Sequence, residues 1–207
     1  MHIQFLGLSS FKYTTKDAVV ITDPTGKESG LTPPRGNADI VILAEPENPM
    51  YSGSQSLSGD PFVIPHPGEY DIKGVTVTGI PLKQEKGHVT TFLIESEELK
   101  ILSLSHIADF SMKEDELEDL GEIDILVVPV GGTSVLSASN AAKVVNQIEP
   151  KIVIPSHYQQ DGIRMTLDPV ERFVKEMGGK AETVEKLIVK KKDITGIEST
   201  KVIIISA

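Results

Sequence analysis

The sequence contains no cysteine and no tryptophan, and only five of its 207 residues are histidine. Without cysteine, the chain forms neither a disulfide framework nor a thiolate metal site. Any metal or proton-transfer chemistry based on histidine must therefore be assembled from very few side chains. The missing cysteine does not indicate a redox compartment, because a chain without thiols is compatible with every compartment.

Long apolar runs and an excess of positive charge are also missing. No stretch approaches the ~18 consecutive apolar residues of a membrane-spanning helix, and Met1–Gly7 lacks the basic start of a signal peptide. The 20 basic residues are outnumbered by 30 acidic ones, which gives a net charge of −10. Nucleic acids and anionic membranes bind clustered cations, and the run Lys190–Lys192 is too short to supply them. We therefore expect a cytoplasmic protein that binds neither nucleic acid nor membrane.

The length, and the absence of a long linker rich in Pro, Ser or Gly, predict a single domain over residues 1–207. The first half is typical of short strands separated by turn residues. We predict these strands at His2–Leu6, Ala18–Thr22, Ile40–Leu43, Pro61–Ile64, Val75–Ile80 and Thr90–Ile94.

The second half alternates strands with helices. Strands are predicted at Ile123–Val130, Lys151–Ile154, Thr183–Val189 and Lys201–Ser206. Helix start and stop signals run from Ser111 to Gly121, from Ser137 or Ser139 to Pro150, and from Asp168-Pro169 to Gly178-Gly179. This order of elements indicates an α/β protein in which two sheets pack together with helices outside.

Two segments that follow predicted strands carry acidic or imidazole side chains. Glu45 and Glu47 are two residues apart, so an extended backbone would point both carboxylates to one side, where they could bind a hard cation or exchange protons. A solvated acidic loop is the alternative. His106 and Asp109 could be two ligands or an orienting pair, and the alternative is a partly buried histidine near a helix start.

Two further segments combine a buried strand with special residues at its end. Gly131-Gly132 allows backbone N–H groups to face an anion or two chains to approach closely, although a strand-to-helix turn often needs glycine anyway. His157-Tyr158 follows a strand at its carboxyl end, which is the usual place for a ligand site in α/β proteins. A structural histidine is the alternative there.

Taken together, several segments of the chain are familiar. They are Ile3-Gln4-Phe5-Leu6-Gly7 with Phe11, Thr22-Asp23-Pro24, Ala38-Asp39-Ile40-Val41, Pro67-Gly68-Glu69-Tyr70, Gly121 to Gly132, Glu149 to Tyr158, and Pro169-Val170-Glu171-Arg172-Phe173. With them the chain resembles the metallo-β-lactamase superfamily, in particular its small zinc-dependent-hydrolase-like branch related to ascorbate-6-phosphate lactonase. The resemblance extends over essentially the whole chain.

The resemblance implies a four-layer αββα sandwich with an active site along one edge between the two sheets. Members of this superfamily bind one or two metals, usually zinc, through an H-x-H-x-D-H motif, a later histidine, a bridging aspartate and a final histidine. A metal-bound hydroxide then acts as the nucleophile.

The sequence departs from this ligand pattern at nearly every position. Glu45-Pro46-Glu47-Asn48-Pro49-Met50 stands where the resemblance places H-x-H-x-D-H. His106 stands at the bridging-aspartate position, and Asp109 lies where relatives often carry histidine. Only the final ligand, His157, is unchanged, and Asp23, which supports the site from behind the ligands in relatives, also remains.

Two interpretations follow from these replacements. The first is a non-catalytic or diverged homologue that needs no cofactor. The alternative is a metal-dependent hydrolase of an ester, lactone or phosphoester with a rebuilt single-metal site. That site would use Glu45, Glu47, His106, Asp109 and His157, and such a carboxylate-rich set favours Mn, Fe or Mg over Zn.

We expect the partner to be a small molecule or a protein, and the resemblance allows an oligomer, since relatives in this branch assemble. A third hypothesis is a protein that docks a partner through the acidic segment Lys113–Asp124. A solvated helix face explains the same charges.

Overall fold

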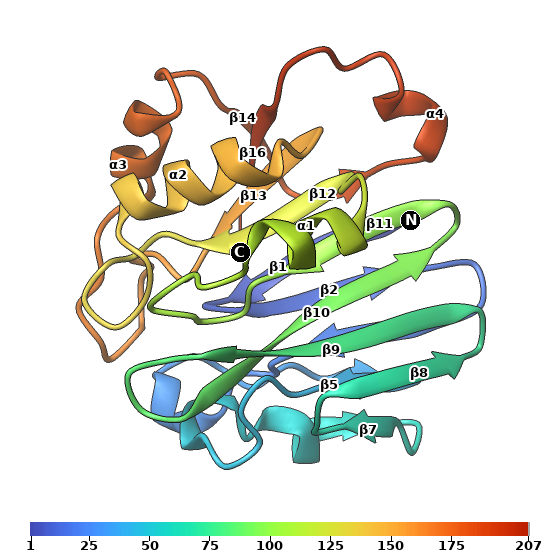
Figure 1. The fold of residues 1–207 in the computed structure, drawn as a ribbon. Coiled ribbons are helices and arrows are strands. Elements are labelled where there is room, and N and C mark those ends of the chain that lie inside the picture. Colours follow the sequence, from blue (N-terminus) through green and yellow to red (C-terminus); the bar gives the residue numbers. More distant parts are fainter. Residues whose placement is uncertain (207) are drawn as a thin grey trace.

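A computed structural model describes residues 1–206 of the chain, in which two large β-sheets pack face to face (Figure 1). Ala207, the last residue of the predicted domain, lies outside the described residues. Buried residues of both sheets form one continuous hydrophobic core, to which Phe11 of one sheet and Phe92 of the other contribute fully buried rings.

The first sheet has six strands in the order β15-β1-β2-β3-β5-β7. They are β1 (His2–Gly7), β2 (Ser10–Thr14), β3 (Val19–Thr22), β5 (Ile40–Ile42), β7 (Phe62–Ile64) and β15 (Leu187–Ile188). β1, β2 and β3 pair antiparallel, whereas β3, β5 and β7 run parallel to one another. The carboxyl ends of these parallel strands therefore meet at the same edge of the sheet.

The second sheet has eight strands in the order β14-β16-β13-β12-β11-β10-β9-β8. They are β8 (Gly68–Ile72), β9 (Val75–Lys83), β10 (His88–Ser96), β11 (Leu99–Ser103), β12 (Ile125–Pro129), β13 (Ile152–Ser156), β14 (Glu182–Val184) and β16 (Lys201–Ile205). Burial alternates along the start of β9, as expected for a strand with one solvated face. Every residue of β12 and β13 is buried, because this parallel pair is covered on both faces.

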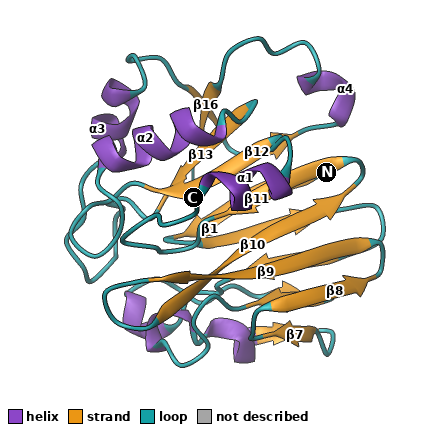
Figure 2. Ribbon diagram, in the orientation of Figure 1, coloured by secondary structure: helices purple, strands orange, loops and turns teal. Residues whose placement is uncertain are grey.

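Helices cover the outer face of the eight-stranded sheet (Figure 2). They are α1 (Glu114–Leu120), α2 (Ala138–Ile148) and α3 (Val170–Glu176), with the short α4 (Lys191–Ile194) before the last strand. The segments over the other sheet are the 3-10 helices η1 (Lys27–Ser29), η2 (Pro49–Tyr51) and η3 (Gly53–Ser56) and the paired strands β4 (Gly36–Asn37) and β6 (Leu57–Ser58). Leu57 packs there against a small apolar cluster that includes Ile21 and Val41. The predicted α/β class and αββα order are confirmed.

Some element boundaries differ from the predictions. α1 is capped at Lys113, not at Ser111, and the backbone N–H of Lys113 donates to Glu116 Oε2 at 2.8 Å. α3 has Pro169 as its N-cap residue, without a side-chain capping bond, and the Asp168 carboxylate accepts a hydrogen bond from Arg172 at 2.6 Å.

The predicted strand Thr183–Val189 is divided into β14 and β15, which belong to different sheets. β2, β8 and α4 were not predicted from the sequence, and β11 was predicted only as a strand before His106, without bounds. β2 and β8 carry Lys or Asp and Glu within the strand, and this polarity hides the pattern of burial.

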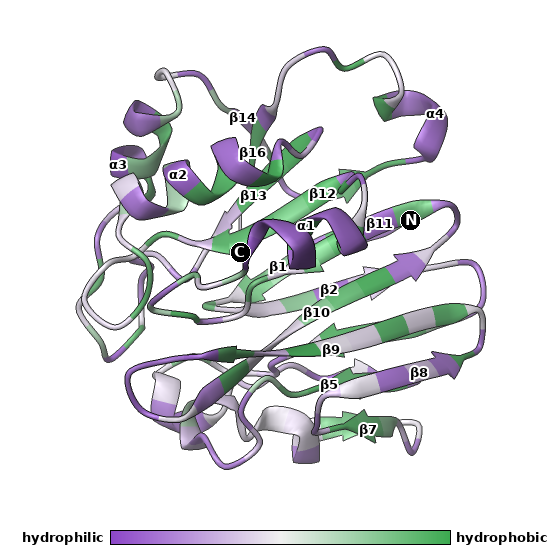
Figure 3. Cartoon of the chain, in the orientation of Figure 1, coloured by the Kyte–Doolittle hydropathy of each residue, from purple (hydrophilic) through white to green (hydrophobic). Residues whose placement is uncertain are grey.

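The basic run and the acidic segment have structural explanations. Lys191 Nζ donates to both carboxylate oxygens of the buried Asp124, at 2.8 and 2.9 Å. In α1 only Leu120 is buried, and the acidic residues face solvent (Figure 3). Docking of a partner on α1 stays a hypothesis. Within residues 1–206, no helix has both the length and the apolar character needed to cross a membrane.

Two phenylalanines offer a matched test of this core. Phe173 on α3 is fully buried, whereas Phe62 on the edge strand β7 is 51% exposed. Phe173→Ala should lower the free energy of unfolding by about 3–5 kcal/mol, because it removes apolar contacts and leaves a cavity. Phe62→Ala should lower it by less than about 1 kcal/mol. Urea unfolding measures both changes, and equal losses would contradict the placement of α3 on the core.

Candidate functional site

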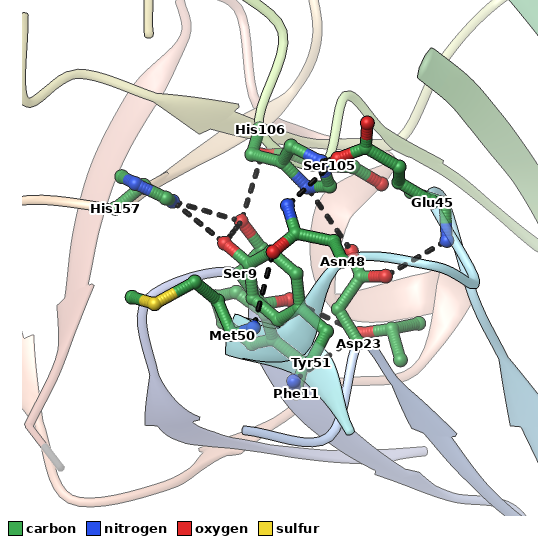
Figure 4. Close-up of polar contacts among 12 residues, drawn as sticks. Ser9, Phe11, Asp23, Glu45, Asn48, Met50, Tyr51, Ser105, His106 and His157 are labelled. Atoms are coloured by element: carbon green, nitrogen blue, oxygen red, sulfur yellow. Dashed lines mark hydrogen bonds and ion pairs between the residues drawn. The ribbon is translucent and has the colours of Figure 1, made fainter. Parts of the chain in front are cut away.

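The chemistry-bearing residues meet where strands of both sheets end (Figure 4). Ser9 lies in the turn between β1 and β2, Asp23 follows β3, and Glu45 follows β5. His106 and His157 follow β11 and β13 of the other sheet. Residues from five distant parts of the chain thus converge at one edge between the two sheets, as the resemblance implied.

The backbone at this edge is strained. Leu8, Asp23, Ser105 and His157 all have positive φ angles, of 53°, 40°, 52° and 51°. None is glycine, and such conformations cost on the order of 1 kcal/mol or more each. They persist only where the surrounding structure fixes them, and such residues gather at functional sites.

Gly131 explains how His157 is held in place. A Cβ atom on Gly131 would lie 2.1 Å from the His157 carbonyl oxygen, so no other residue fits there without displacing the backbone. The His157 N–H donates across to the Leu8 carbonyl of the first sheet at 2.9 Å. The glycine turn that the sequence singled out therefore serves close packing against the histidine.

His157 is buried within a network of hydroxyl groups. Its Nδ1 lies 3.1 Å from both Ser9 Oγ and Tyr51 Oη, and Ser9 Oγ donates to the Ser105 carbonyl at 3.1 Å. Burial, with a smaller contribution from the charge of His106, lowers the pKa of His157 to about 3. The ring is therefore neutral at physiological pH, and its Nε2 has no protein partner.

His106 lies between two carboxylates. Its Nε2 is 3.3 Å from Glu45 Oε2, and its Nδ1 is 3.9 Å from Asp23 Oδ2. Asp23 is 1% exposed, and its other oxygen accepts the Ala44 N–H at 2.8 Å. Burial raises the pKa of Asp23, and the His106 charge opposes that rise.

The pKa of Glu45, the other carboxylate beside His106, is shifted in the opposite direction from that of Asp23. The hydrogen bond with His106 lowers the pKa of Glu45, and the Asn48 amide assists by donating to Glu45 Oε2 at 2.7 Å. Glu45 is therefore ionised at neutral pH. It is the more exposed of the two carboxylates that flank His106.

Only part of the predicted metal set comes together. Glu45 contacts His106, and the rings of His106 and His157 have centroids 6.5 Å apart. Glu47 and Asp109 are exposed. Among residues 1–206, no group of three or more His, Asp or Glu side chains is placed to hold a metal ion. The five-residue ligand set stays a prediction.

The donors at this edge do not fit a metal centre as they are arranged. Asp23 Oδ2, His106 Nδ1 and His157 Nε2 are buried without a hydrogen-bond partner, which is a feature that metal ligands share. The Tyr51 side chain, however, lies between the two histidines: its ring stacks on His106 at 4.7 Å, and its hydroxyl contacts His157. Tyr51 thus separates the two histidine rings that a shared ion would have to join.

A pocket of about 540 Å³ opens above these residues. Its lining includes Glu45, His106, His157, Met50, Val89 and Met165. Acidic, imidazole and apolar groups in one small pocket suit a small organic molecule.

Sequence reasoning missed Ser9, Tyr51 and Ser105. Tyr51 directly follows the segment that replaces the ligand motif, and this position was the one available signal.

The lowered pKa of His157 can be tested by pH titration. In the folded chain the ring should not titrate between pH 5 and 8 in NMR spectra. The unfolded chain binds a proton below about 6.5 and the folded chain does not, so stability should fall as pH drops from 7 to 5, by on the order of 2 kcal/mol. His157→Gln should remove this part of the pH dependence. A ring titration midpoint near 6.5 would contradict the burial of His157.

Comparison with known proteins identifies the family of the chain. The profile of the beta-lactamase superfamily domain matches residues 2–157. A protein of Thermococcus onnurineus named UPF0173 metal-dependent hydrolase is 32% identical over 181 residues, which cover 81% of this chain and 77% of that protein. A UPF0173 protein of Pyrococcus furiosus is 38% identical over 74 residues, or 36% of this chain and 33% of that protein.

Solved structures agree with these sequence matches. A protein of Thermotoga maritima, provisionally described as a Zn-dependent hydrolase of the metallo-beta-lactamase superfamily, has a TM-score of 0.82 and 27% identity. The match covers 99% of this chain and 97% of that one. The metallo hydrolase Igni18 of Ignicoccus hospitalis, with 16% identity and a TM-score of 0.63 over 97% and 94% of the two chains, shares the fold. The strand ends that carry His106 and His157 thus belong to a known architecture, and the chain is a member of the beta-lactamase superfamily domain family.

Proposed function

We propose that the chain is a hydrolase of small esters or lactones in which Glu45, supported by His106, is the general base. The observation that carries this proposal is the 3.3 Å contact between Glu45 and His106 at the pocket, with the buried Asp23 behind it. A base oriented by a second group, which is itself oriented by a third, is the usual arrangement for activating water or a nucleophile.

The names of the relatives support hydrolysis as the reaction class. The similar protein of Thermococcus onnurineus is named a metal-dependent hydrolase, and the chain matches over most of its length. These names favour the hydrolase interpretation over a protein without catalytic activity. The pocket of about 540 Å³ has the size for a small substrate.

The proposed reaction uses groups of this chain. Glu45 takes a proton from a water molecule while the water oxygen attacks the substrate carbonyl carbon. As the carbon–oxygen bond to the leaving group breaks, Glu45 returns the proton to the leaving oxygen. The products are a carboxylic acid and an alcohol, which remain joined as a hydroxy acid when the substrate is a lactone.

The lowered pKa of Glu45 supports a choice among ester substrates. The hydrogen bond from His106 lowers this pKa, which makes Glu45 a weak base that is fully ionised at neutral pH. A weak base suits substrates with good leaving groups or ring strain, such as aryl esters and lactones. Asp23 and His106 are positioning residues in this scheme.

A protein that binds a small molecule without converting it is the second candidate function. The contact of Tyr51 with both His106 and His157 favours it, because this side chain lies where the donors would otherwise face one another. In either case we propose a small-molecule ligand and not a nucleic acid, in keeping with the net charge of −10. We also propose a location in the cytoplasm. Neither candidate requires a cofactor.

Two neighbouring glutamates provide the matched test. Glu45→Gln should lower kcat/KM for 4-nitrophenyl acetate or γ-butyrolactone by about 100-fold or more, because it removes the base. Glu47→Gln should leave kcat/KM unchanged, because Glu47 is exposed and outside the pocket lining. 4-Nitrophenyl phosphate completes the panel, and each assay is repeated with EDTA.

The possible outcomes separate the candidates. No turnover of any substrate by the wild type, together with saturable binding to the pocket, would support the second candidate and reject the hydrolase. Turnover that EDTA abolishes would overturn the metal-independent scheme and return the site to the metal-dependent alternative.

A further inference from the structure

Tyr51 is the one aromatic side chain among the described residues that touches both site histidines. It is 3% exposed, and its ring stacks on His106 with centroids 4.7 Å apart and planes inclined by 23°. Its hydroxyl lies 3.1 Å from His157 Nδ1 and 3.3 Å from Ser9 Oγ. The centroids of the two histidine rings are 6.5 Å apart, and the phenol connects them (Figure 4).

The backbone around Tyr51 fixes this position. Asn48 caps η2, since its Oδ1 accepts the Met50 N–H at 3.0 Å and its carbonyl accepts the Tyr51 N–H at 3.0 Å. The Gly26 N–H donates to the Met50 carbonyl at 2.7 Å, and a Cβ on Gly26 would lie 2.3 Å from Ser52 Oγ. The turn that carries Tyr51 is therefore closely packed against the loop after β3, so the ring is held in place.

The groups around Tyr51 have the chemistry of metal ligands. They are one carboxylate oxygen of Asp23 without a partner, the His106 ring whose Nδ1 has no partner, and the His157 ring whose Nδ1 faces the phenol. Two imidazoles and one carboxylate are a ligand set that Zn²⁺ and Fe²⁺ accept. Among residues 1–206, these three groups are not placed around a common ion as they stand.

We propose that Tyr51 takes the place of a metal ion: the chain carries a latent divalent-metal site of Asp23, His106 and His157, which this tyrosine keeps closed. The phenol links the two histidines: its ring stacks on His106, and its hydroxyl contacts His157. A metal ion would link the same two residues by coordination. Removal of the side chain opens the volume between the three donors to a cation. The inference does not depend on the hydrolase proposal, because it concerns binding alone.

Zinc binding to the full-length chain tests this inference. Isothermal titration with ZnCl₂ at pH 7 should detect one ion per chain in Tyr51→Ala, with a Kd at least about tenfold below that of any binding by the wild type. The double variant Tyr51→Ala with His157→Gln should lose the gain. Tyr70→Ala removes a tyrosine whose hydroxyl donates to the His66 carbonyl away from the site, and it should not gain a zinc site.

Two further variants keep the test decisive. Tyr51→Phe retains the stacked ring and should bind no more zinc than the wild type, because the volume stays filled. If Tyr51→Ala does not fold, as judged by circular dichroism, Tyr51→Leu takes its place. A folded small-residue variant without any gain in zinc binding would overturn the inference. Stoichiometric zinc on the wild type that is lost in His157→Gln would also overturn it.

Discussion

The hydrogen bond from the His157 N–H to the Leu8 carbonyl, 2.9 Å long, joins the two sheets at the edge on which the site depends. Both residues have left-handed backbones, and Gly131 packs so closely on His157 that a Cβ atom would collide with it. This contact brings the end of β13 to the turn between β1 and β2, and so places the His157 ring beside Ser9. The hydroxyl network around His157 Nδ1 includes Ser9, which this contact brings to the ring.

The burial of Asp23 is the main electrostatic problem at this edge. A carboxylate that is 1% exposed needs a compensating positive charge or a proton, and its raised pKa expresses that need. In a metal centre the cation would supply the charge. Here His106 lies 3.9 Å from one oxygen and also contacts Glu45, so one imidazole serves a buried and an exposed carboxylate. This imidazole therefore connects the pocket carboxylate of Glu45 with the buried carboxylate of Asp23.

The sequence was informative where burial follows a local pattern. Alternation along Val75–Thr78 predicted β9, Ser137 capped α2 as expected, and His157 lies at a strand end as proposed. The expectation that Glu45 and Glu47 face one side assumed an extended backbone. The chain turns there instead, with the Asn48 N–H donating to the Glu45 carbonyl at 3.0 Å, and Glu47 is exposed. The contacts of Tyr51 and Ser9 could not be predicted, because they arise only when distant strand ends meet.

The backbone strain at this edge of the sheets is relevant to whether the pocket binds a ligand. Leu8, Asp23, Ser105 and His157 each hold a conformation that costs on the order of 1 kcal/mol or more, in a protein class whose total stability is about 5–15 kcal/mol. Non-glycine residues with positive φ also occur at Lys73, Glu97 and Glu98, where they form the tight turns of the β8–β9 and β10–β11 hairpins. At the pocket edge, the four strained residues instead surround the small volume where His157 contacts Tyr51 and Asp23 lies near His106. Backbone strain and convergent polar groups at one edge are features that binding sites share, and both are present here.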